Sequence, residues 1–196
     1  AGKTTLFNLI SGDARADAGR VDYAGRDVTR LRPHQRCRSG IGRSYQVPQP
    51  FGNMSVFENL VTAACFGGQQ TEREAWRTAH EVLAQTGLIA QANAPAGGLR
   101  LLDRKRLELA RALATKPRLL LLDEIAGGLT EPEAAVLVSE LRRIKARGVT
   151  MIWIEHVVHA LLSLADRLFV INFGQKLAEG EPVSYTHLRA HETKAN

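Results

Sequence analysis

The stretch Leu119-Leu120-Leu121-Leu122-Asp123-Glu124 is the most informative segment of this 196-residue chain, because it combines an apolar run with two acids at its end. Four consecutive leucines after the break Lys116-Pro117-Arg118 are typical of a strand buried on both faces, as the central strands of parallel sheets are. Such a strand presents its last side chains at the carboxyl edge of the sheet, where α/β proteins bind ligands. Two adjacent acids there fit an aspartate that holds Mg²⁺ and a glutamate that polarises a water molecule. The alternative is a strand followed by two solvated carboxylates.

The chain opens with Ala1-Gly2-Lys3-Thr4-Thr5, followed by an apolar run with helical periodicity. Gly-Lys-Thr before a helix is the second half of a phosphate-binding loop, in which backbone N–H groups and the helix dipole attract anionic oxygens. Lys3 would reach the terminal phosphates of a nucleotide, and the Thr4 hydroxyl would ligate Mg²⁺. The tripeptide alone is common, but its place ahead of a helix and the later acid-ended strand make the pair specific. We expect a fragment that begins inside this loop and lacks the N-terminal strands.

Length and composition indicate one compact core, or a core with a small lobe, because 44% of the residues are hydrophobic. No apolar run reaches about 18 residues and the amino terminus carries no secretory signal, so neither a membrane span nor secretion is expected. Cys37 and Cys65 are far apart and lack metal-ligand spacing, so we interpret them as reduced thiols without an assigned role. The net charge of +6 comes from scattered residues and fits a membrane surface, a membrane subunit or polyphosphate as well as nucleic acid.

The first half of the chain predicts a small antiparallel part and a helical lobe. Residues 19–28 read as a hairpin, residues 31–38 as a short helix or turn, and residues 40–46 as an extended segment that ends in Gln46 before a proline-bounded loop. Helices are predicted over residues 54–66, with a Ser55–Glu58 capping box, and over residues 71–88. We place them in a lobe of about residues 54–103. Its core is expected to contain Trp76, Val82 and Leu83.

The second half alternates helices and strands, which predicts an α/β fold with a mainly parallel sheet. A helix from about residue 103 leads into the leucine strand, and a helix over residues 131–147 follows it. A second buried strand is expected at residues 149–154, directly before Glu155 and His156. A helix at residues 157–164, a strand at residues 167–172, a turn, and residues 175–180 complete the core.

These motifs, in this order, resemble the ATP-binding subunits of ABC transporters over nearly all residues from 2 to 182. Gly2-Lys3-Thr4 is similar to the end of that family's Walker A loop, and Gln46 to its Q-loop glutamine. The strand ending in Asp123 and Glu124 resembles Walker B, and His156 resembles the switch histidine. Within the family, the segments at residues 6–12, 54–60 and 105–122 most resemble the branched-chain amino-acid, or urea and amide, uptake subfamily. The implied fold is a P-loop NTPase core of the ABC type.

The resemblance implies the cofactors ATP and Mg²⁺ and a role for each motif. ATP would be bound by Gly2, Lys3, Thr4 and Thr5, and the metal by Thr4, Gln46 and Asp123. The catalytic set would be Glu124 as general base or water-positioner, Gln46, and His156 as a sensor of the terminal phosphate. A histidine at a strand end is otherwise often a structural residue.

The resemblance also implies an assembly at the cytoplasmic face of the cell membrane. Transmembrane permease subunits would dock on residues 51–55, from Phe51 to Ser55, and a second ATP-binding subunit would complete the ATP sites. A periplasmic or extracellular solute-binding protein would act indirectly, and no nucleic acid is expected. The full-length protein would be a transport-coupled ATPase that serves the uptake of branched-chain amino acids or related small amides, as the subfamily does, whereas a fragment is expected to be inactive alone.

Two positions depart from the family pattern. The signature Leu-Ser-Gly-Gly-Gln falls at residues 99–103, where only Leu99 agrees, and bulky Arg100 and Leu102 replace serine and glycine. This indicates a weak half-site for the other subunit's ATP and a partner that is not identical. Thr130 stands where the family has Asp or Asn, which weakens the case for signalling across the dimer at that loop.

Two other classes remain open. A soluble ABC-type ATPase acting on ribosomes or DNA fits the basic charge, although no second cassette or zinc-type cysteine spacing is visible. A P-loop kinase fits the acid pair and His156 poorly. Residues 1–183 are assigned to a partial ABC ATPase domain, and residues 184–196 to a tail outside the family pattern that resembles translated adapter sequence.

Overall fold

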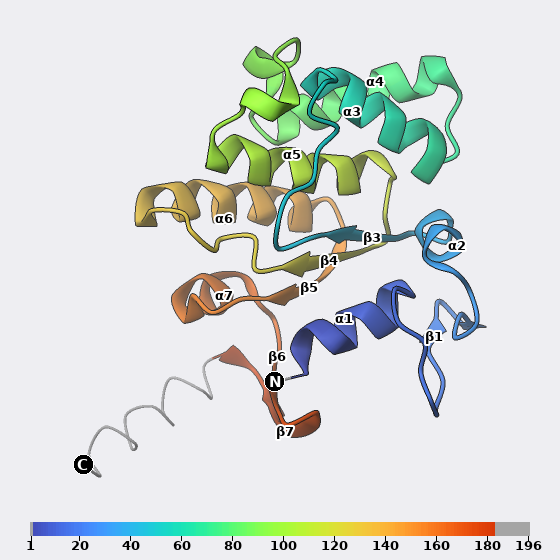
Figure 1. Ribbon diagram of the computed structural model, residues 1–196. Helices are drawn as coiled ribbons and strands as arrows, with labels where there is room; N and C mark the ends of the chain where they lie inside the picture. Colours follow the sequence, from blue (N-terminus) through green and yellow to red (C-terminus); the bar gives the residue numbers. More distant parts are fainter. Residues whose placement is uncertain (1, 183–196) are drawn as a thin grey trace.

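A computed structural model describes residues 2–182, so the tail assigned to residues 184–196 lies outside the described residues. Figure 1 shows a central sheet with helices on both faces, a group of helices at the top and a hairpin at the bottom. The strands are β1 (Asp22–Tyr23), β2 (Arg26–Asp27), β3 (Ile41–Ser44), β4 (Leu119–Asp123), β5 (Thr150–Ile154), β6 (Leu168–Asn172) and β7 (Gln175–Gly180). The α-helices are α1 (Lys3–Ser11), α2 (Pro33–Arg38), α3 (Val56–Thr62), α4 (Glu72–Gln85), α5 (Leu101–Ala114), α6 (Glu131–Ala146) and α7 (Val158–Leu164).

The leucine strand is the middle strand of the central sheet, as its composition predicted. β4 pairs in parallel with β3 on one side and with β5 on the other. Leu120, Leu121 and Leu122 are fully buried, and Asp123 ends the strand at 2% exposure. The carboxyl ends of the three strands therefore meet at one edge, which carries the acids.

Alternation along the strands divides the core into two layers, because successive side chains of a strand point to opposite faces. Leu120 and Leu122 join the large cluster that includes α5 and α6. Leu121 instead packs in a smaller cluster with Phe7 of α1 and with the two strand residues Ile41 and Ile154. Figure 1 shows the same layering, with α1 on one side of the sheet and α5 and α6 on the other.

The helical part begins with the predicted capping box. The Ser55 hydroxyl accepts a hydrogen bond from the backbone N–H of Glu58, and the Glu58 carboxylate accepts one from the backbone N–H of Ser55. α3 then continues as a π-helical turn, η1 (Ala63–Gly67), ahead of α4. Val82 and Leu83 are buried as expected, but the expectation for Trp76 is wrong: it is 54% exposed. Its ring packs edge-on against Phe57 at 5.4 Å, on the outer side of α4.

The expectation that residues 149–154 form a strand is confirmed, but the expectation that this strand is buried is wrong. Thr150 is exposed and Ile152 is 39% exposed, whereas Ile154 is buried. The reason is its position at the edge of the three-stranded sheet, with β4 on one side only. The apolar run therefore predicted the strand correctly, but it predicted more burial of the strand's side chains than the structure has.

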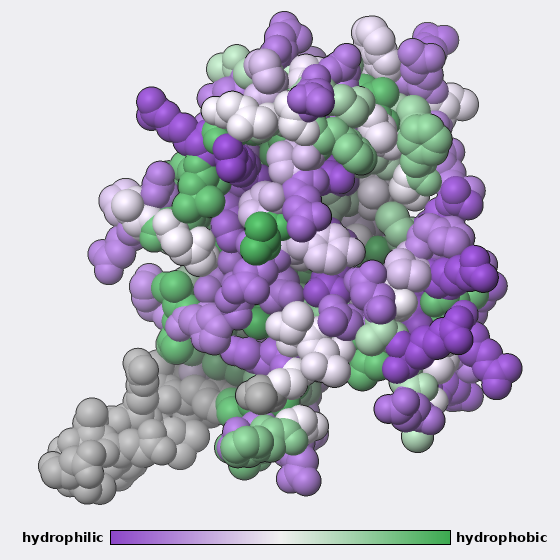
Figure 2. Space-filling model, in the orientation of Figure 1, coloured by the Kyte–Doolittle hydropathy of each residue, from purple (hydrophilic) through white to green (hydrophobic). Residues whose placement is uncertain are grey.

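The remaining strands form two small antiparallel hairpins, β1–β2 and β6–β7. The first was predicted at residues 19–28, and the turn of the second at Phe173 and Gly174. Figure 2 shows hydrophobic residues gathered at the bottom of the view, over β6 and β7. They are Phe169, Phe173 and Leu177, all more than half exposed. Among the described residues, no helix combines the length and the apolar character needed to cross a bilayer.

Candidate functional site

The paired acids lie where the middle strand leaves the sheet. Asp123 is the last residue of β4, and Glu124 directly follows it with a φ of 48°, in the left-handed region that non-glycine residues seldom adopt. The backbone N–H of Glu124 donates to the carbonyl of Ile154 in the neighbouring strand at 2.8 Å. The two carboxylates have different partners: Glu124 contacts Gln46 and His156, and Asp123 contacts Arg43. Such backbone conformations persist where the surrounding structure fixes them, often at functional sites.

Glu124 lies between the two other predicted catalytic side chains. The Gln46 amide, just beyond β3, donates from Nε2 to Oε2 of Glu124 at 2.6 Å. Nε2 of His156, just beyond β5, lies 2.7 Å from Oε1 of the same carboxylate. Each strand of the central sheet thus supplies one member of the group. The Glu124 side chain is 17% exposed and His156 is 67% exposed, so the group opens to solvent on the histidine side.

A buried lysine joins the loops that follow β3 and β4. Lys105 of α5 is 4% exposed, and its ammonium donates to the carbonyl oxygens of Gln46 at 2.9 Å and of Glu124 at 3.2 Å. Burial lowers the pKa of Lys105, while the carboxylates of Glu155, Glu124 and Asp123 act in the opposite direction. Lys105 therefore links the loops that carry Gln46 and Glu124 to the helix layer.

Glu155 secures the loop after the acids from the other side. It is 6% exposed, and its two oxygens accept hydrogen bonds from the backbone N–H groups of Ala126 at 3.0 Å and of His156 at 2.9 Å. A buried carboxylate is stable where backbone donors satisfy it. Glu155 thus holds the chain that carries His156 against the chain that follows Glu124.

An open cavity of about 550 Å³ brings Thr4 near the start of α1 together with Asp123. Its lining residues are Thr4, Arg43, Tyr45, Gln46, Val47, Gln49, Glu108, Arg111 and Asp123. Oδ1 of Asp123 is buried and has no hydrogen-bond partner among the described residues. An unpartnered buried carboxylate oxygen is costly, so this atom calls for a positively charged ligand.

The first turn of α1 supplies the second element of the site. Gly2 caps the helix with a φ of 103°, and a Cβ at this position would lie 3.3 Å from backbone atoms of Gly174, so glycine is required there. No acidic side chain lies in the first turn, and no side chain caps it. Lys3, half-buried, Thr4 and Thr5 are the first three helical residues. Their N–H groups belong to the unpaired set at a helix start, which attracts anions.

Charge of both signs surrounds the cavity. Glu108 of α5 is 6% exposed, and burial raises its pKa, although the Arg111 guanidinium acts in the opposite direction at 3.2 Å. Arg111 also donates to the carbonyl of Gln49 at 2.8 Å and lies over the ring of Phe51 at 5.0 Å. α5 therefore lines the cavity with Glu108 and Arg111, and Arg111 also contacts the loop predicted to meet a membrane partner.

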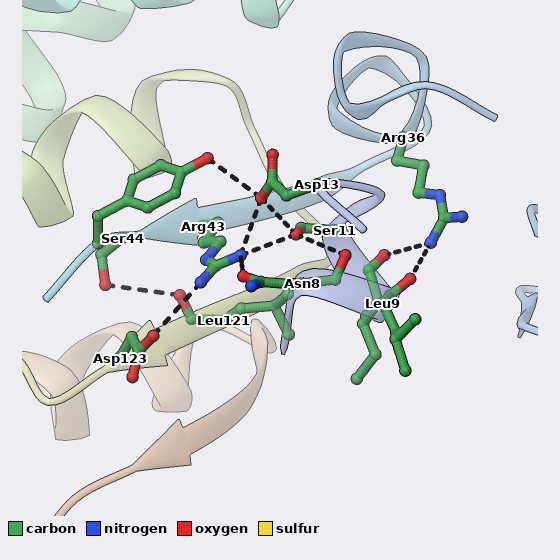
Figure 3. Close-up of polar contacts among 11 residues, drawn as sticks. Asn8, Leu9, Ser11, Asp13, Arg36, Arg43, Ser44, Leu121 and Asp123 are labelled. Atoms are coloured by element: carbon green, nitrogen blue, oxygen red, sulfur yellow. Dashed lines mark hydrogen bonds and ion pairs between the residues drawn. The ribbon is translucent and has the colours of Figure 1, made fainter. Parts of the chain in front are cut away.

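Sequence reasoning missed the residue that connects these parts. Figure 3 shows the guanidinium of Arg43 between Asp123 on one side and Asn8, Ser11 and Asp13 on the other. Lys105 and Glu155 were missed as well, since their roles depend on backbone carbonyls and N–H groups that no sequence motif records. Arg43 left one signal: a charged residue inside a strand of otherwise small and apolar residues.

The structure brings together the predicted residues in two groups. Gln46, Glu124 and His156 are in contact, and Thr4 and Asp123 share one cavity with Gln46. Lys3 and Thr5 adjoin Thr4 at the start of α1 and do not line the cavity. Mg²⁺ prefers oxygen ligands. Two such atoms belong to residues that line this cavity: the Thr4 hydroxyl oxygen and the unpartnered Oδ1 of Asp123.

Comparisons with known proteins identify the family of the chain. Residues 1–127 match the family model of the ABC transporters. The chain is 34% identical to the high-affinity branched-chain amino acid transport ATP-binding protein BraF of Pseudomonas aeruginosa, over 93% of this chain and 77% of that protein. It is 33% identical to the probable branched-chain amino acid transport ATP-binding protein LivG of Methanocaldococcus jannaschii, over 92% and 75% respectively.

Two solved structures have the same fold. A nucleotide-free ATP-binding cassette from an ABC transporter superposes with a TM-score of 0.83 at 29% identity, covering 95% of this chain and 80% of that one. An ATP-binding cassette solved in its ADP conformation gives 0.79 at 31% identity, covering 92% and 76%. The strand order, the paired acids, the helix that begins with Gly-Lys-Thr and these matches lead to one conclusion: the chain belongs to the ABC transporter family, as an ATP-binding, ATP-hydrolysing subunit.

Proposed function

We propose that this subunit energises an importer for branched-chain amino acids or related small amides, from the cytoplasmic face of the cell membrane. The likeness to branched-chain amino acid transport proteins supports the solute class. The observation that carries the proposed chemistry is the Glu124 carboxylate held between Gln46 and His156 beside the cavity of Thr4 and Asp123. Three strands and one helix start converge there on the groups that phosphoryl transfer requires.

The nucleotide is proposed to bind at the start of α1. The N–H groups after Gly2 and the ammonium of Lys3 suit the outer phosphates, and Thr4 and Thr5 lie in the same turn. The nucleotide-binding residues of the proposal are therefore Gly2, Lys3, Thr4 and Thr5.

The proposed metal is Mg²⁺, held by Thr4, Gln46 and Asp123. The unpartnered Oδ1 of Asp123 and the shared cavity support this set. When bound, the cation would neutralise charge on the phosphate oxygens. Oδ1 of Asp123 has no partner among the described residues, whereas both oxygens of Glu124 are contacted by side chains of neighbouring loops, so we assign the metal to Asp123 and the water to Glu124.

Glu124 is proposed as the group that orients the attacking water and receives its proton. Gln46 and His156 each contact one of its oxygens, and each oxygen keeps a second lone pair that can accept the proton of the water. A terminal phosphate offers both side chains an alternative partner. Gln46 and His156 would then link hydrolysis to the movement of their loops.

The permease is proposed to contact residues 51–55. The loop is held in one conformation by Asn59, which is fully buried: its amide donates to the carbonyls of Phe51 and Ser55 and accepts from the Phe51 N–H at 2.9 Å. Phe51 remains 47% exposed and rests on Arg111, which also contacts the carbonyl of Gln49 and the carboxylate of Glu108 at the cavity. A displacement of Phe51 by the permease would thus be transmitted to the site through the Phe51–Arg111 and Arg111–Gln49 contacts.

The second ATP-binding subunit is proposed to be non-identical. Arg100 caps the start of α5 without a side-chain cap hydrogen bond, and the helix begins with Leu101, which is 45% exposed. Serine and glycine would bring hydroxyl and backbone close to a partner's phosphate, and these larger side chains keep it away. A solute-binding protein outside the membrane would deliver the solute to the permease.

Uptake measurements test the proposed solute class. Cells that depend on this subunit should take up radiolabelled leucine when they carry the wild-type protein and lose that uptake with Glu124→Gln. Radiolabelled urea provides the comparison for the amide branch of the proposal. Uptake of neither solute, with intact ATPase activity of the assembled complex, would refute the solute assignment and leave the ATPase assignment standing.

A further inference from the structure

A charged side chain that belongs to none of the predicted motifs lies at the centre of the site. Arg43 of β3 is the second-last residue of its strand, and its side chain is only 7% exposed. One terminal nitrogen lies within hydrogen-bond distance of Oδ1 of Asn8 at 2.7 Å, Oγ of Ser11 at 2.9 Å and Oδ2 of Asp13 at 2.8 Å. The other lies 3.3 Å from Oδ2 of Asp123. Figure 3 shows this bridge from α1 to the end of β4.

Strand alternation explains why Arg43 and Asp123 meet. Ile41 and Leu121 face α1 in the small core cluster, and Arg43 and Asp123 each follow two residues later on the same face. The register pairs Arg43 with Leu121 across the two parallel strands. The arginine therefore reaches the terminal acid of the neighbouring strand beneath α1, the helix whose other end carries Lys3 and Thr4.

The charges of this group are unevenly buried. Asp123 is 2% exposed, so an uncompensated negative charge there would be costly, and Arg43 is its ion-pair partner among the described residues. The Asp13 side chain is 29% exposed and remains partly solvated. The contact to Asp13 is also shorter than the contact to Asp123. Arg43 therefore makes its shorter contacts with the end of α1 and the residues that follow it, and a longer contact with Asp123.

The guanidinium keeps its place without Asp123. It lies 4.7 Å from the ring centroid of Tyr45 and 5.9 Å from that of Phe7, in addition to its bonds to the end of α1. Asp123 can therefore release Arg43 without leaving that charge unpaired. The carboxylate cannot lose both Arg43 and a cation at the same time.

We propose that Arg43 is a positioning residue and the internal counter-ion of Asp123: it neutralises and orients the acid in the metal-free protein and competes with the divalent cation for it. The inference rests on the proposed function, because it takes Asp123 as the metal-binding acid. Arg43 leaves Oδ1 of Asp123 free for the cation and ties that atom's position to α1. The strength of the Arg43–Asp123 contact then sets how tightly the site holds its metal, and Asp13 moderates it by sharing the same guanidinium.

Opposite shifts in metal affinity test the proposal. The probe is Mn²⁺ titrated into the full-length chain with ADP at the protein concentration, with the EPR signal of the free ion compared with that of a titration into the same ADP without protein. Arg43→Met removes the competitor and should tighten Mn²⁺ binding about threefold or more, the scale of coupling within one ion-pair network. Asp13→Asn leaves Asp123 as the sole carboxylate partner of Arg43 and should weaken binding by a similar factor. Arg43→Lys retains the charge and should stay within about twofold of wild type.

A matched control removes a carboxylate from an ion pair far from the site. Asp22 pairs with Arg20 at 2.8 Å on the surface, and Asp22→Asn makes the same charge change as Asp13→Asn without touching Arg43. It should leave Mn²⁺ affinity unchanged. If Arg43→Met does not fold, Asp13→Asn and Arg43→Lys still decide the question.

The outcomes separate the two levels of inference. A wild-type chain that binds no Mn²⁺ with ADP would overturn the proposed function itself. A wild-type chain that binds the ion, with Asp13→Asn unchanged or tighter, or with Arg43→Met unchanged or weaker, would overturn the role of Arg43 alone. Thermal unfolding gives a second readout, since Mn²⁺ with ADP should raise the Tm of Arg43→Met more than that of wild type.

Discussion

Nε2 of His156 lies 2.7 Å from Oε1 of Glu124, although the two residues follow different strands and are 32 positions apart. The parallel pairing of β4 with β5, in which Asp123 is opposite Ile154, places both strand ends at one level. Each residue then extends beyond its strand by one or two positions. The contact is therefore a consequence of strand register.

Glu124→Gln should abolish most ATP turnover and retain nucleotide binding. The amide keeps the size of the side chain but cannot accept a proton, and a positioned base contributes about 10²–10⁴ in rate. ATPase activity of the assembled complex and ADP binding should be measured in parallel. Glu72→Gln, at an exposed position in the first turn of α4, is the control. Full activity of Glu124→Gln would contradict the proposed role of this carboxylate.

His156→Ala should lower ATPase activity by about 10–100-fold, the scale of a small displacement of catalytic groups. Removing the imidazole frees Oε1 of Glu124 and leaves Gln46 as its remaining contact. The exposed position of His156 predicts an unchanged Tm. A lower Tm with normal turnover per folded molecule would identify a structural role instead.

Lys105→Met should separate activity from stability. Methionine fills the buried site without a charge to desolvate, so the free energy of unfolding should be similar to wild type or higher. The carbonyls of Gln46 and Glu124 lose their common donor, and ATPase activity should fall about tenfold or more as the two loops shift. Lys176→Met, on the exposed hairpin, is the matched control.

The pH dependence of the same variant has a defined sign. Burial lowers the pKa of Lys105 in the folded state, so the unfolded chain binds this proton more tightly. Wild-type stability should therefore gain a contribution as pH rises from the lowered folded value toward the ordinary 10.5. Urea denaturation across this range should show a smaller rise for Lys105→Met. Identical slopes would indicate that the lysine remains solvated.

Thr71→Ala should destabilise the chain by about 1 kcal/mol, because it removes the N-cap of α4. The Thr71 hydroxyl and backbone N–H lower the pKa of Glu74, which completes the capping box. The stabilisation from Glu74 should be present above its ordinary pKa and lost as pH falls through the lowered value. Urea midpoints of wild type and Thr71→Ala, measured at neutral and at acidic pH, report both effects. The two midpoints should lie closer together in acid.

Arg100→Ser combined with Leu102→Gly should raise the ATPase activity of the assembled transporter. The smaller residues would restore the approach of the α5 start to a partner's nucleotide, where backbone N–H groups attract phosphate. The change should require the second ATP-binding subunit, so the rate should be compared with and without it. Unchanged activity in the complex would count against unequal ATP sites.

The type and order of most elements, and the residues at the carboxyl edge of the sheet, follow from the amino-acid sequence without knowledge of the structure. Four leucines fixed β4 as a buried middle strand, and strand ends of parallel sheets share an edge, so Asp123, Glu124 and His156 could be expected together. Local chemistry likewise fixed the capping boxes, because their hydrogen bonds span only three residues.

The neighbours of each side chain became known from the three-dimensional packing. The pattern of β5 could not show that, within residues 2–182, only β4 pairs with it, and that of α4 could not show that Trp76 is exposed. The role of Arg43 depends on Asp13 and Asp123, which are 30 and 80 positions away along the chain. Hydrogen bonds and ion pairs act over about 3 Å in space, so they follow from the packing of the strands and helices rather than from spacing in sequence.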